Sequence, residues 1–542
     1  MSSVGRVCTQ AAWAVAAVVA AGCAANDAGG AAATAGAPYP PNDNGGSGGA
    51  AGAGGAGATG GTGGSLPPEQ EVESSYESPV ATGRFVWVAN PSSGRVAFVD
   101  AVTLQVKTTE AGNGPEHLAA VPSPDQDVAV VINTLSSSAT LLRADATGVI
   151  DSVELPVAAA SNSWAVSKGG TWALAWTDAR KVTALSDAEG CQDVTVISTV
   201  AGKEAATRLT VGYRPVAVSF ADDEKHAYAV TQDGISVLDM EAPGGPAATK
   251  LVPISYDLED PGSRDVAITP DGRFALVRRD GSSHVTVVGI DDGTLTEVEL
   301  PGEVTDMDVS PDGAHAIAVI RSTGQAAVLP VPGIATDPAH YELVTVSGTV
   351  VGSVAMASSA DTALLYSNAS DQEQVVQLDF GGTQPATRVL KLHAPVLAVF
   401  LSSTAANAIV LHNPVAGWTD GSAGAFSVMN LAPLLPAKIV GTKAKPWAVA
   451  LTPDGDYSVV AERDETAKVY GAYLVRTANQ QVDRYELASP PIAVGAVTGA
   501  RRAFVAQQHT EGRITFIDLD TGQARTLTGF ELGARVVDGS GM

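Results

Sequence analysis

The stretch that decides the fold is VAITPDGRFALVRR, residues 266–279. A short apolar run leads into the turn sequence TPDG at 269–272, and a second apolar run begins at Phe274. Proline fixes φ at the second turn position, aspartate hydrogen-bonds to its own backbone, and glycine accepts a positive φ. The stretch therefore predicts two β-strands joined by a tight turn.

The same arrangement recurs ten times between residues 84 and 542. The run after the turn is FVWVAN at 85, VAVVIN at 128, WALAWT at 172, AYAVTQ at 227, FALVRR at 274, AIAVIR at 316, ALLYSN at 363, AIVLHN at 408, YSVVAE at 457 and AFVAQQ at 503. A period near 46 residues with three or four short β runs per unit is the size of a propeller blade. Because the 3.6-residue periodicity of helical solenoids is absent, we predict an all-β protein: a β-propeller of about ten four-stranded repeats.

The number of rings is open at this stage. Ten copies exceed the usual four to eight blades, so one large ring and two smaller rings in series are both compatible with the sequence. No Gly/Pro-rich linker divides residues 84–542, which favours one ring. The last segment, ELGARVVD at 531–538, lies where another inter-unit strand belongs, and we expect it to pair with the first unit near Phe85 and close the ring.

Three motifs link the repeat to a known family. They are the run VWVAN at 86–90, the run VAFVD at 96–100, and the proline before the inter-unit strand, as in Gly114-Pro115 and Lys445-Pro446. The repeat resembles the YVTN family of β-propellers over about 85% of the chain. The resemblance implies the fold and leaves function open, because propellers include binding modules, lactonases and redox enzymes.

Residues 1–23 have the features of an export signal. Arg6 supplies a positive charge, and the apolar stretch at 11–22 is too short to span a bilayer. The sequence Ala-Ala-Gly-Cys ending at Cys23 resembles the lipobox of bacterial lipoproteins, which implies lipidation of Cys23. Ala24 after the cysteine implies, by the same resemblance, an outer-membrane location. The alternative is ordinary cleavage near Ala25 and a soluble secreted product.

A linker is predicted between the signal and the repeats. Residues 24–68 are almost all Gly, Ala, Ser, Thr, Pro and Asn, a composition that buries nothing. Random-coil scaling gives such a segment an r.m.s. reach of roughly 35–40 Å. The predicted organisation is a lipoprotein signal peptide at 1–23, a disordered linker at 24–83 and a β-propeller domain at 84–542.

Charge and cysteine content exclude other classes. The chain has 32 Lys and Arg against 58 Asp and Glu, a formal net charge of −26. This balance argues against a nucleic-acid partner and favours cationic partners or divalent counter-ions. Three cysteines cannot build a disulfide framework, and Cys191, among acidic neighbours, is predicted to be inert.

Candidate ligand-binding residues come from two sets of loops. One set precedes each inter-unit strand, the other follows each first run, and both are expected at one rim of the central channel. The combination of charged, amide and Trp side chains suits a polar or carbohydrate-like ligand or a protein loop; ordinary solvated turn residues are the alternative. The candidates are Glu116, His117, Trp164, Arg214, Arg264, Asp306, His412, Lys445, Trp447, Arg463 and His509.

Motifs for catalysis and cofactors are missing from the sequence. It contains no HxH, HExxH, CxxCH or Walker pattern and no GxSxG nucleophile elbow, since the GGSGG tract before residue 68 is linker, so no catalytic residue, metal or cofactor is predicted. We expect a lipid-anchored extracytoplasmic binding or scaffold module for a protein or glycan partner at the cell envelope. The alternative is a lactonase-like or redox enzyme with its site in the channel, for which Glu116, His117, Asp306 and His412 are the candidates. A third hypothesis is that the acidic head mainly provides a hydrated surface.

Overall fold

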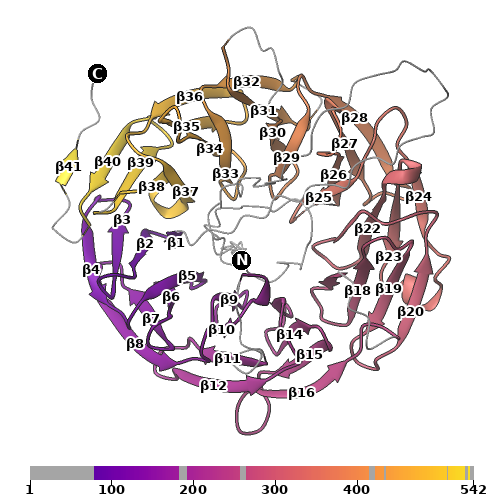
Figure 1. The fold of residues 1–542 in the computed structure, drawn as a ribbon, viewed down its shortest axis with the longest axis horizontal. Helices are drawn as coiled ribbons and strands as arrows, with labels where there is room; N and C mark the ends of the chain where they lie inside the picture. The colour runs from indigo at the N-terminus through magenta and orange to yellow at the C-terminus, as the bar shows by residue number, and fades with distance from the viewer. Residues whose placement is uncertain are drawn as a thin grey trace, which may run out of the picture.

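The chain forms one ring of ten antiparallel β-sheets (Figure 1). The computed structural model describes residues 79–181, 192–256, 264–359, 361–413, 421–432, 435–509, 511–530 and 535–537. Both the all-β propeller of about ten four-stranded repeats and the single ring are confirmed. Within each blade, four strands follow one another in sequence from the ring centre outward, and we call them A, B, C and D.

The first five blades cover residues 80–299. Blade 1 contains β1 (Val80–Ala81), β2 (Phe85–Asn90), β3 (Arg95–Asp100) and β4 (Val106–Glu110). Blade 2 contains β5 (Pro115–Val121), β6 (Asp127–Asn133), β7 (Ser138–Ala144) and β8 (Ile150–Pro156). Blade 3 contains β9 (Ser163–Val166), β10 (Trp172–Trp176), β11 (Asp193–Ser198) and β12 (Ala205–Thr210). Blade 4 contains β13 (Ala217–Phe220), β14 (His226–Thr231), β15 (Gly234–Asp239) and β16 (Ala247–Val252). Blade 5 contains β17 (Arg264–Ile268), β18 (Phe274–Arg279), β19 (His284–Gly289) and β20 (Leu295–Glu299).

The other five blades complete the ring. Blade 6 contains β21 (Asp306–Val309), β22 (His315–Ile320), β23 (Gln325–Pro330) and β24 (Glu342–Thr345). Blade 7 contains β25 (Ser353–Met356), β26 (Thr362–Tyr366), β27 (Gln374–Asp379) and β28 (Ala386–Lys391). Blade 8 contains β29 (Val396–Leu401), β30 (Asn407–His412), β31 (Gly424–Asn430) and β32 (Lys438–Thr442). Blade 9 contains β33 (Lys445–Leu451), β34 (Tyr457–Asp464), β35 (Val469–Arg476) and β36 (Gln481–Glu486). Blade 10 contains β37 (Pro491–Val497), β38 (Arg502–Gln507), β39 (Arg513–Asp518), β40 (Ala524–Thr528) and β41 (Arg535–Val537).

Only four short helices occur among the described residues. They lie in the connections between strands: η1 (Ala179–Lys181), η2 (Arg321–Thr323), α1 (Gly333–Thr336) and η3 (Thr498–Ala500).

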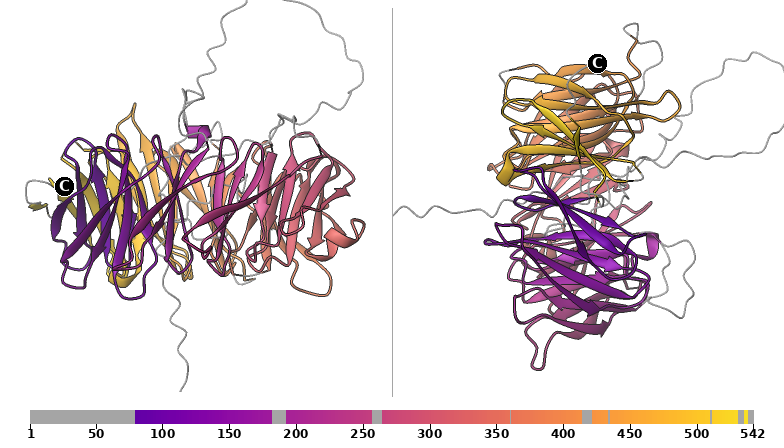
Figure 2. Two further views of the ribbon diagram at one scale, coloured as in Figure 1. Left: turned by 90° about the horizontal axis from the view of Figure 1, so that it is seen from below. Right: turned by 90° about the vertical axis from the view of Figure 1, so that its left-hand side faces the viewer.

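The strands cross the ring from one face to the other (Figure 2). Strands B and C are almost continuously buried, as in β6 and β7, because both faces of each sheet pack against neighbouring blades. The outer D strands alternate between half-buried and exposed residues, as in β28. The sequence accordingly reads as apolar runs in the middle strands and as mixed runs at the periphery.

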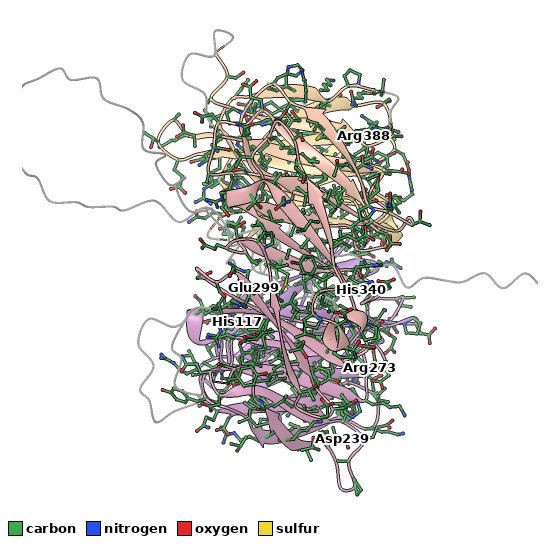
Figure 3. The ribbon with its side chains drawn as sticks, turned by 90° about the vertical axis from the view of Figure 1, so that its right-hand side faces the viewer. His117, Asp239, Arg273, Glu299, His340 and Arg388 are labelled. Carbon is green, nitrogen blue, oxygen red and sulfur yellow. The ribbon has the colours of Figure 1, made fainter. Side chains whose placement is uncertain are left out.

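The two faces of the ring carry different connections. Each A strand is antiparallel to its B strand, so that Pro115 lies opposite Asn133 and Lys445 lies opposite Arg463. Every A strand therefore begins where a B strand ends, and we call this side the rim face. The A–B and C–D turns lie on the opposite face. Figure 3 places His117 of β5 on the rim face and Arg273 of an A–B turn on the other.

The turn at 269–272 has the structure predicted from its sequence. Gly272 has a φ of 69°, and the Thr269 hydroxyl donates to Asp271 Oδ1 at 2.6 Å. A Cβ atom on Gly272 would lie 2.0 Å from the Tyr228 hydroxyl oxygen of the preceding blade. Only glycine satisfies both the positive φ and this close approach between blades.

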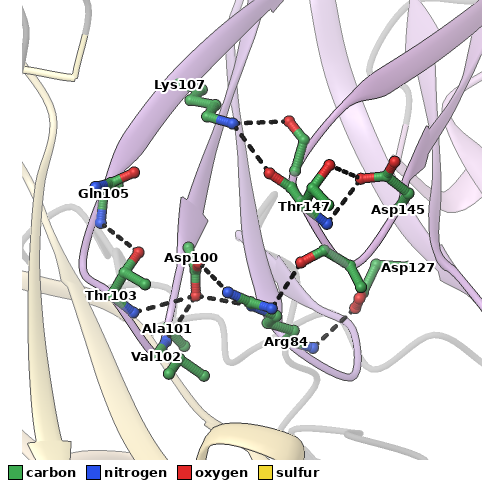
Figure 4. A network of polar contacts seen from close by, with 12 residues as sticks. Arg84, Asp100, Ala101, Val102, Thr103, Gln105, Lys107, Asp127, Asp145 and Thr147 are labelled. Carbon is green, nitrogen blue, oxygen red and sulfur yellow. Dashed lines mark hydrogen bonds and ion pairs between the residues drawn. The ribbon is translucent and has the colours of Figure 1, made fainter.

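Polar side chains join each blade to the next on the opposite face. In Figure 4 the Arg84 backbone N–H donates to Asp127 Oδ1 at 2.8 Å, and Lys107 Nζ donates to the Gly148 carbonyl at 2.9 Å. The Arg84 guanidinium also pairs with Asp100 at 2.6 Å. Burial opposes ionisation of Asp100, but hydrogen bonds from Arg84 and from two backbone N–H groups lower its pKa to about 2.

The contact made by Lys107 is repeated around the ring. A side chain on the D strand of one blade donates to a carbonyl in the C–D turn of the next blade. This hydrogen bond fixes the turn against the neighbouring blade. Further examples are Lys250 to Asp291 at 2.9 Å, Lys438 to Gln480 at 2.7 Å and Tyr485 to Gly522 at 2.7 Å.

Blade 10 meets blade 1 through the same kinds of contact. The Gly499 N–H donates to the Gly83 carbonyl at 3.1 Å, as the Asp222 N–H donates to the Pro270 carbonyl between blades 4 and 5. Arg502 Nη1 donates to the Ala101 carbonyl at 2.7 Å. The apolar side of this seam is built from Phe504, Phe516, Ile514 and Leu527 of blade 10 and Val86, Val99, Ala97 and Leu104 of blade 1.

The predicted closing strand is wrong. Within 531–538, β41 pairs antiparallel with β40 and adds a fifth strand to the outer edge of blade 10, whereas residues 531–534 and 538 lie outside the described part. The inner edge of β2 is taken by β1, where Val80 lies opposite Trp87, and β1 precedes the boundary at residue 84. The ring therefore closes by packing two complete blades together rather than by exchanging a strand.

Candidate functional site

The rim candidates are distributed around the whole ring rather than gathered at one point. The two predicted loop sets do meet at the rim face, because A-strand starts and B-strand ends are paired in register. The structure brings two groups into contact: Glu116, His117 and Trp164 on blades 2 and 3, and Lys445, Trp447 and Arg463 on blade 9. The remaining candidates lie apart on other blades.

The group on blades 2 and 3 surrounds a β-bulge at the start of β5. His117 Nε2 lies 3.9 Å from Glu116 Oε2, and their side chains are 15% and 35% exposed. Trp164 packs against apolar side chains of both blades and donates from Nε1 to the His117 carbonyl at 2.9 Å. Trp164 therefore joins two blades and is largely committed to packing, while Glu116 remains the more accessible side chain.

Arginines of blades 4 and 5 were also predicted at the rim. Arg214 has a φ of 53°, and its guanidinium carbon lies 5.7 Å from the centre of the Tyr213 ring. Arg264 begins β17, with its backbone opposite Arg279, and its side chain lies outside the described part. His509 follows β38 on blade 10 and accepts a hydrogen bond at Nδ1 from the Glu511 N–H at 3.2 Å.

Asp306 is buried at the start of β21 and joins two blades. One carboxylate oxygen accepts the Met307 N–H at 2.9 Å, and the other accepts the Val354 N–H of blade 7 at 2.8 Å. The side chain is 3% exposed. Both oxygens are therefore occupied by backbone donors, which holds the inner strands of blades 6 and 7 together.

His412 is fully buried at the end of β30. Its Nδ1 lies 3.1 Å from the Pro395 carbonyl, and its Nε2 lies 2.7 Å from the Ser427 hydroxyl. Because a carbonyl only accepts, we assign the proton to Nδ1, so that Nε2 accepts from Ser427. Burial lowers the pKa of His412 to about 4, against partial compensation by hydrogen bonds to Pro395 and Ala394.

This pKa predicts a specific pH dependence of stability. The unfolded chain binds a proton near pH 6.5, while folded His412 stays neutral down to about pH 4. Unfolding free energy should therefore fall by about 3 kcal/mol as the pH drops through this window, and level off below it. His412→Gln should remove that part of the slope in urea unfolding measured from pH 7.5 to 4. The exposed control His284→Gln should keep it, and an unchanged slope in both variants would contradict the assignment.

The group on blade 9 combines cationic and aromatic side chains. Lys445 is exposed at the start of β33, and the Arg463 guanidinium carbon lies 5.6 Å from the centre of the Trp447 ring. Arg463 also donates to the Pro491 carbonyl at 3.3 Å and pairs with Glu465. This places a positively charged rim segment on a chain whose net charge is −26.

A buried carboxylate beneath this segment was missed by the sequence analysis. Glu462 is fully buried and accepts hydrogen bonds from Arg484, Tyr473 and the backbone N–H groups of Lys443 and Ala444 at 2.6–3.0 Å. Burial and the neighbouring carboxylate raise the pKa of Tyr473. The network holds the loop that carries Lys443 against the middle of blade 9.

Gly471 shows how tightly this carboxylate is enclosed. A Cβ atom on Gly471, in the C strand of blade 9, would lie 2.4 Å from Glu462 Oε1. The sequence offered one signal for this buried carboxylate. Gly471 lies in the middle of a strand, and the preceding strand carries Glu462 in an otherwise apolar run.

Other predicted sites lie outside the described residues. These include the lipidation site Cys23 and the lone thiol Cys191. Among the described residues, no three His, Cys, Asp or Glu side chains are grouped in a way that holds a metal ion. In the same part of the chain no helix is long and apolar enough to cross a membrane.

Comparisons with known proteins show only distant similarities. No protein-family model and no curated protein matches the chain. The dihydro-heme d1 dehydrogenase NirN is 13% identical over 66% of this chain and 72% of its own, with a TM-score of 0.42. A eukaryotic initiation factor is 12% identical over 75% of this chain and 97% of its own, with a TM-score of 0.49. AztD of Citrobacter koseri is 12% identical over 60% of this chain and 88% of its own, with a TM-score of 0.36. These distant similarities, all with TM-scores below 0.5, assign no family, ligand or reaction.

Proposed function

We propose that the chain is a lipid-anchored extracytoplasmic propeller of the YVTN type that acts as a binding or scaffold module at the cell envelope. Its partner is a protein or a glycan held at the rim face. The lipobox-like sequence ending at Cys23 and the Gly/Ala-rich segment after it support an anchored head on a spacer.

The observation that carries the binding function is the basic rim segment of blade 9. Lys443 and Lys445 are exposed there, beside Arg463, whose guanidinium carbon lies 5.6 Å from the centre of the Trp447 ring. Trp447 is 7% exposed and packs in the core shared by blades 9 and 10, so the accessible groups of this segment are the two lysines. Glu462 accepts the backbone N–H groups of Lys443 and Ala444 and so holds their loop in place. Because the rest of the protein is acidic, an acidic partner is attracted to this basic segment and repelled elsewhere on the surface.

The enzyme alternative has weaker support. Two of its four candidates, Asp306 and His412, are buried, and both polar atoms of each side chain are hydrogen-bonded to other groups of the propeller. Glu116 and His117 are the two remaining candidates, and a single carboxylate–imidazole pair 3.9 Å apart on one bulge is not by itself a catalytic constellation. The exposed residues therefore favour binding over catalysis.

Capture from envelope extract tests this function. The immobilised full chain should retain a component that the double variant Lys443→Glu/Lys445→Glu loses. The control is Lys203→Glu, which changes another exposed lysine in a C–D turn of the opposite face. Thermal midpoints of all three proteins should agree within about 2 °C, as expected for exposed positions. Capture that survives rim charge reversal, or that is lost equally with Lys203→Glu, would contradict the proposal. Glycosidase treatment of the extract separates a glycan from a protein partner.

The anchor has its own test. Cys23→Ser should abolish palmitate labelling of the full chain and move the protein from the membrane to the soluble fraction, because one lipid-bearing residue is replaced by an isosteric hydroxyl. Cys191→Ser is the control and should leave labelling unchanged. Unchanged membrane association of Cys23→Ser would overturn the lipidation.

A further inference from the structure

Two carboxylates of β21 join the inner strands of blades 6 and 7. Asp306 accepts the Val354 N–H of β25 at 2.8 Å, and Asp308, two residues further along β21, accepts the Met356 N–H. Each aspartate also accepts the N–H of the residue that follows it, at 2.9 Å in both cases. Because Val354 and Met356 are two residues apart, their N–H groups lie on the same edge of β25, away from β26. The two aspartates therefore repeat one contact along the edge that faces the ring centre (Figure 1).

Asp308 lies in apolar surroundings and has no counter-charge. It is half-buried, its neighbours Met307 and Val309 are buried, and among the described residues it forms no ion pair. β25 carries no titratable group. Besides Asp306, the titratable groups on the strands packed against β21 are Arg264 and Asp265 of β17 and His315 of β22.

These surroundings oppose ionisation of Asp308. Burial raises the pKa of Asp308 from its usual 3.8 to about 7, although hydrogen bonds from the Val309 and Met356 N–H groups partly oppose the shift. A carboxylate without a counter-charge is stabilised only when water reaches it. The closed contact therefore favours the protonated carboxyl group, whereas an open and hydrated contact favours the ionised one.

We infer that the contact between blades 6 and 7 is a pH-sensitive joint, closed while Asp308 is protonated and loosened when this carboxyl group ionises and is hydrated. Linkage sets the direction: the closed joint binds the proton more tightly than a hydrated carboxyl group does, so a rise in pH through the window from about 4 to 7 favours opening. Because β21 and β25 both begin on the rim face, opening alters the inner part of the rim between blades 6 and 7.

Hydrogen exchange of the full chain at pH 5.5 and pH 8.0, corrected for the intrinsic exchange rate, tests the joint. Protection of residues 352–357 should fall about thirtyfold between these pH values, as linkage gives for a pKa that moves from about 7 in the closed joint to 3.8 in the open one. β37 of blade 10, whose described hydrogen bonds involve no carboxylate, should keep its protection. Unchanged or higher protection of residues 352–357 at pH 8.0 would overturn the inference.

Asp308→Asn separates a titrating joint from a merely structural contact. Asparagine keeps a carbonyl acceptor but cannot ionise, so protection of residues 352–357 should no longer depend on pH. The control Asp125→Asn changes an exposed aspartate in the A–B turn of blade 2 and should keep the thirtyfold change. The same pH dependence in Asp308→Asn as in the wild type would contradict the assignment.

Urea unfolding of the wild type and Asp308→Asn gives a second readout. The unfolding equilibrium constant of the wild type, divided by that of the variant, should rise about thirtyfold from pH 5.5 to 8.0. His412 acts in the opposite direction but equally in both proteins, so its contribution cancels in this ratio. A ratio that does not change with pH would show that Asp308 does not control the joint.

Discussion

Glu462→Ala is expected to lower the unfolding free energy by about 3–5 kcal/mol, because it removes one partner of a buried charge pair and leaves several buried donors without an acceptor. Glu462 is fully buried, and Arg484, Tyr473 and the N–H groups of Lys443 and Ala444 all donate to it. The loss should appear as a lower urea midpoint and as faster hydrogen exchange in residues 442–447. Exchange in that segment is a direct measure of how firmly the rim loop is held.

The control for this prediction is an ion pair that is exposed to solvent rather than buried. Arg501 and Asp520 form an exposed salt bridge at 2.7 Å between the A–B and C–D turns of blade 10. Exposed pairs contribute little, so Asp520→Ala should shift the urea midpoint by a small fraction of the Glu462→Ala shift. Equal shifts would show that Glu462 does not hold blade 9 together.

Phe504→Ala is expected to cost about 3–5 kcal/mol and to loosen the seam at which the ring closes. Phe504 is 1% exposed and packs with Phe516 and Val86 between blades 10 and 1. Hydrogen exchange should rise in β2 and β3 of blade 1 as well as in blade 10, although these elements lie at opposite ends of the sequence. The seam has no exchanged strand, so it is held by side-chain packing together with the hydrogen bonds that Gly499 and Arg502 donate to blade 1.

Phe426→Ala provides the matched comparison. Phe426 is fully buried and packs between blades 8 and 9, next to Tyr473. The two variants should lose similar unfolding free energy, but Phe426→Ala should raise exchange in blades 8 and 9 and leave blade 1 unchanged. If Phe504→Ala fails to affect blade 1, the seam does not depend on this packing.

The repeated part of the fold could be predicted from the sequence because each unit specifies its own local structure. The turn at 269–272 fixes its φ values through proline and glycine, and the apolar runs on either side pair as neighbours. Ten such units imply ten blades. The closing strand was predicted wrongly because β1 is only two residues long and leaves no periodic signal, while 531–538 has the composition of a strand wherever it pairs.

The candidate site was predictable only in its placement on one face. The pairing register of the A and B strands brings the two loop sets together, but it does not show which of their side chains are buried between blades. Asp306 binds a backbone group 48 residues away and His412 binds a serine on the next strand, so neither is distinguishable in sequence from an exposed rim residue. Glu462 was missed for the same reason, since its donors come from two different strands and a loop.

Electron microscopy of the full chain tests the central claim most directly, because the rim face requires that ten blades form one closed ring. Class averages viewed along the axis should show a single ring with ten radial densities and continuous density between the blade that begins near Val80 and the blade that contains Phe504. Two smaller rings, or an open arc with a gap at that seam, would contradict the account.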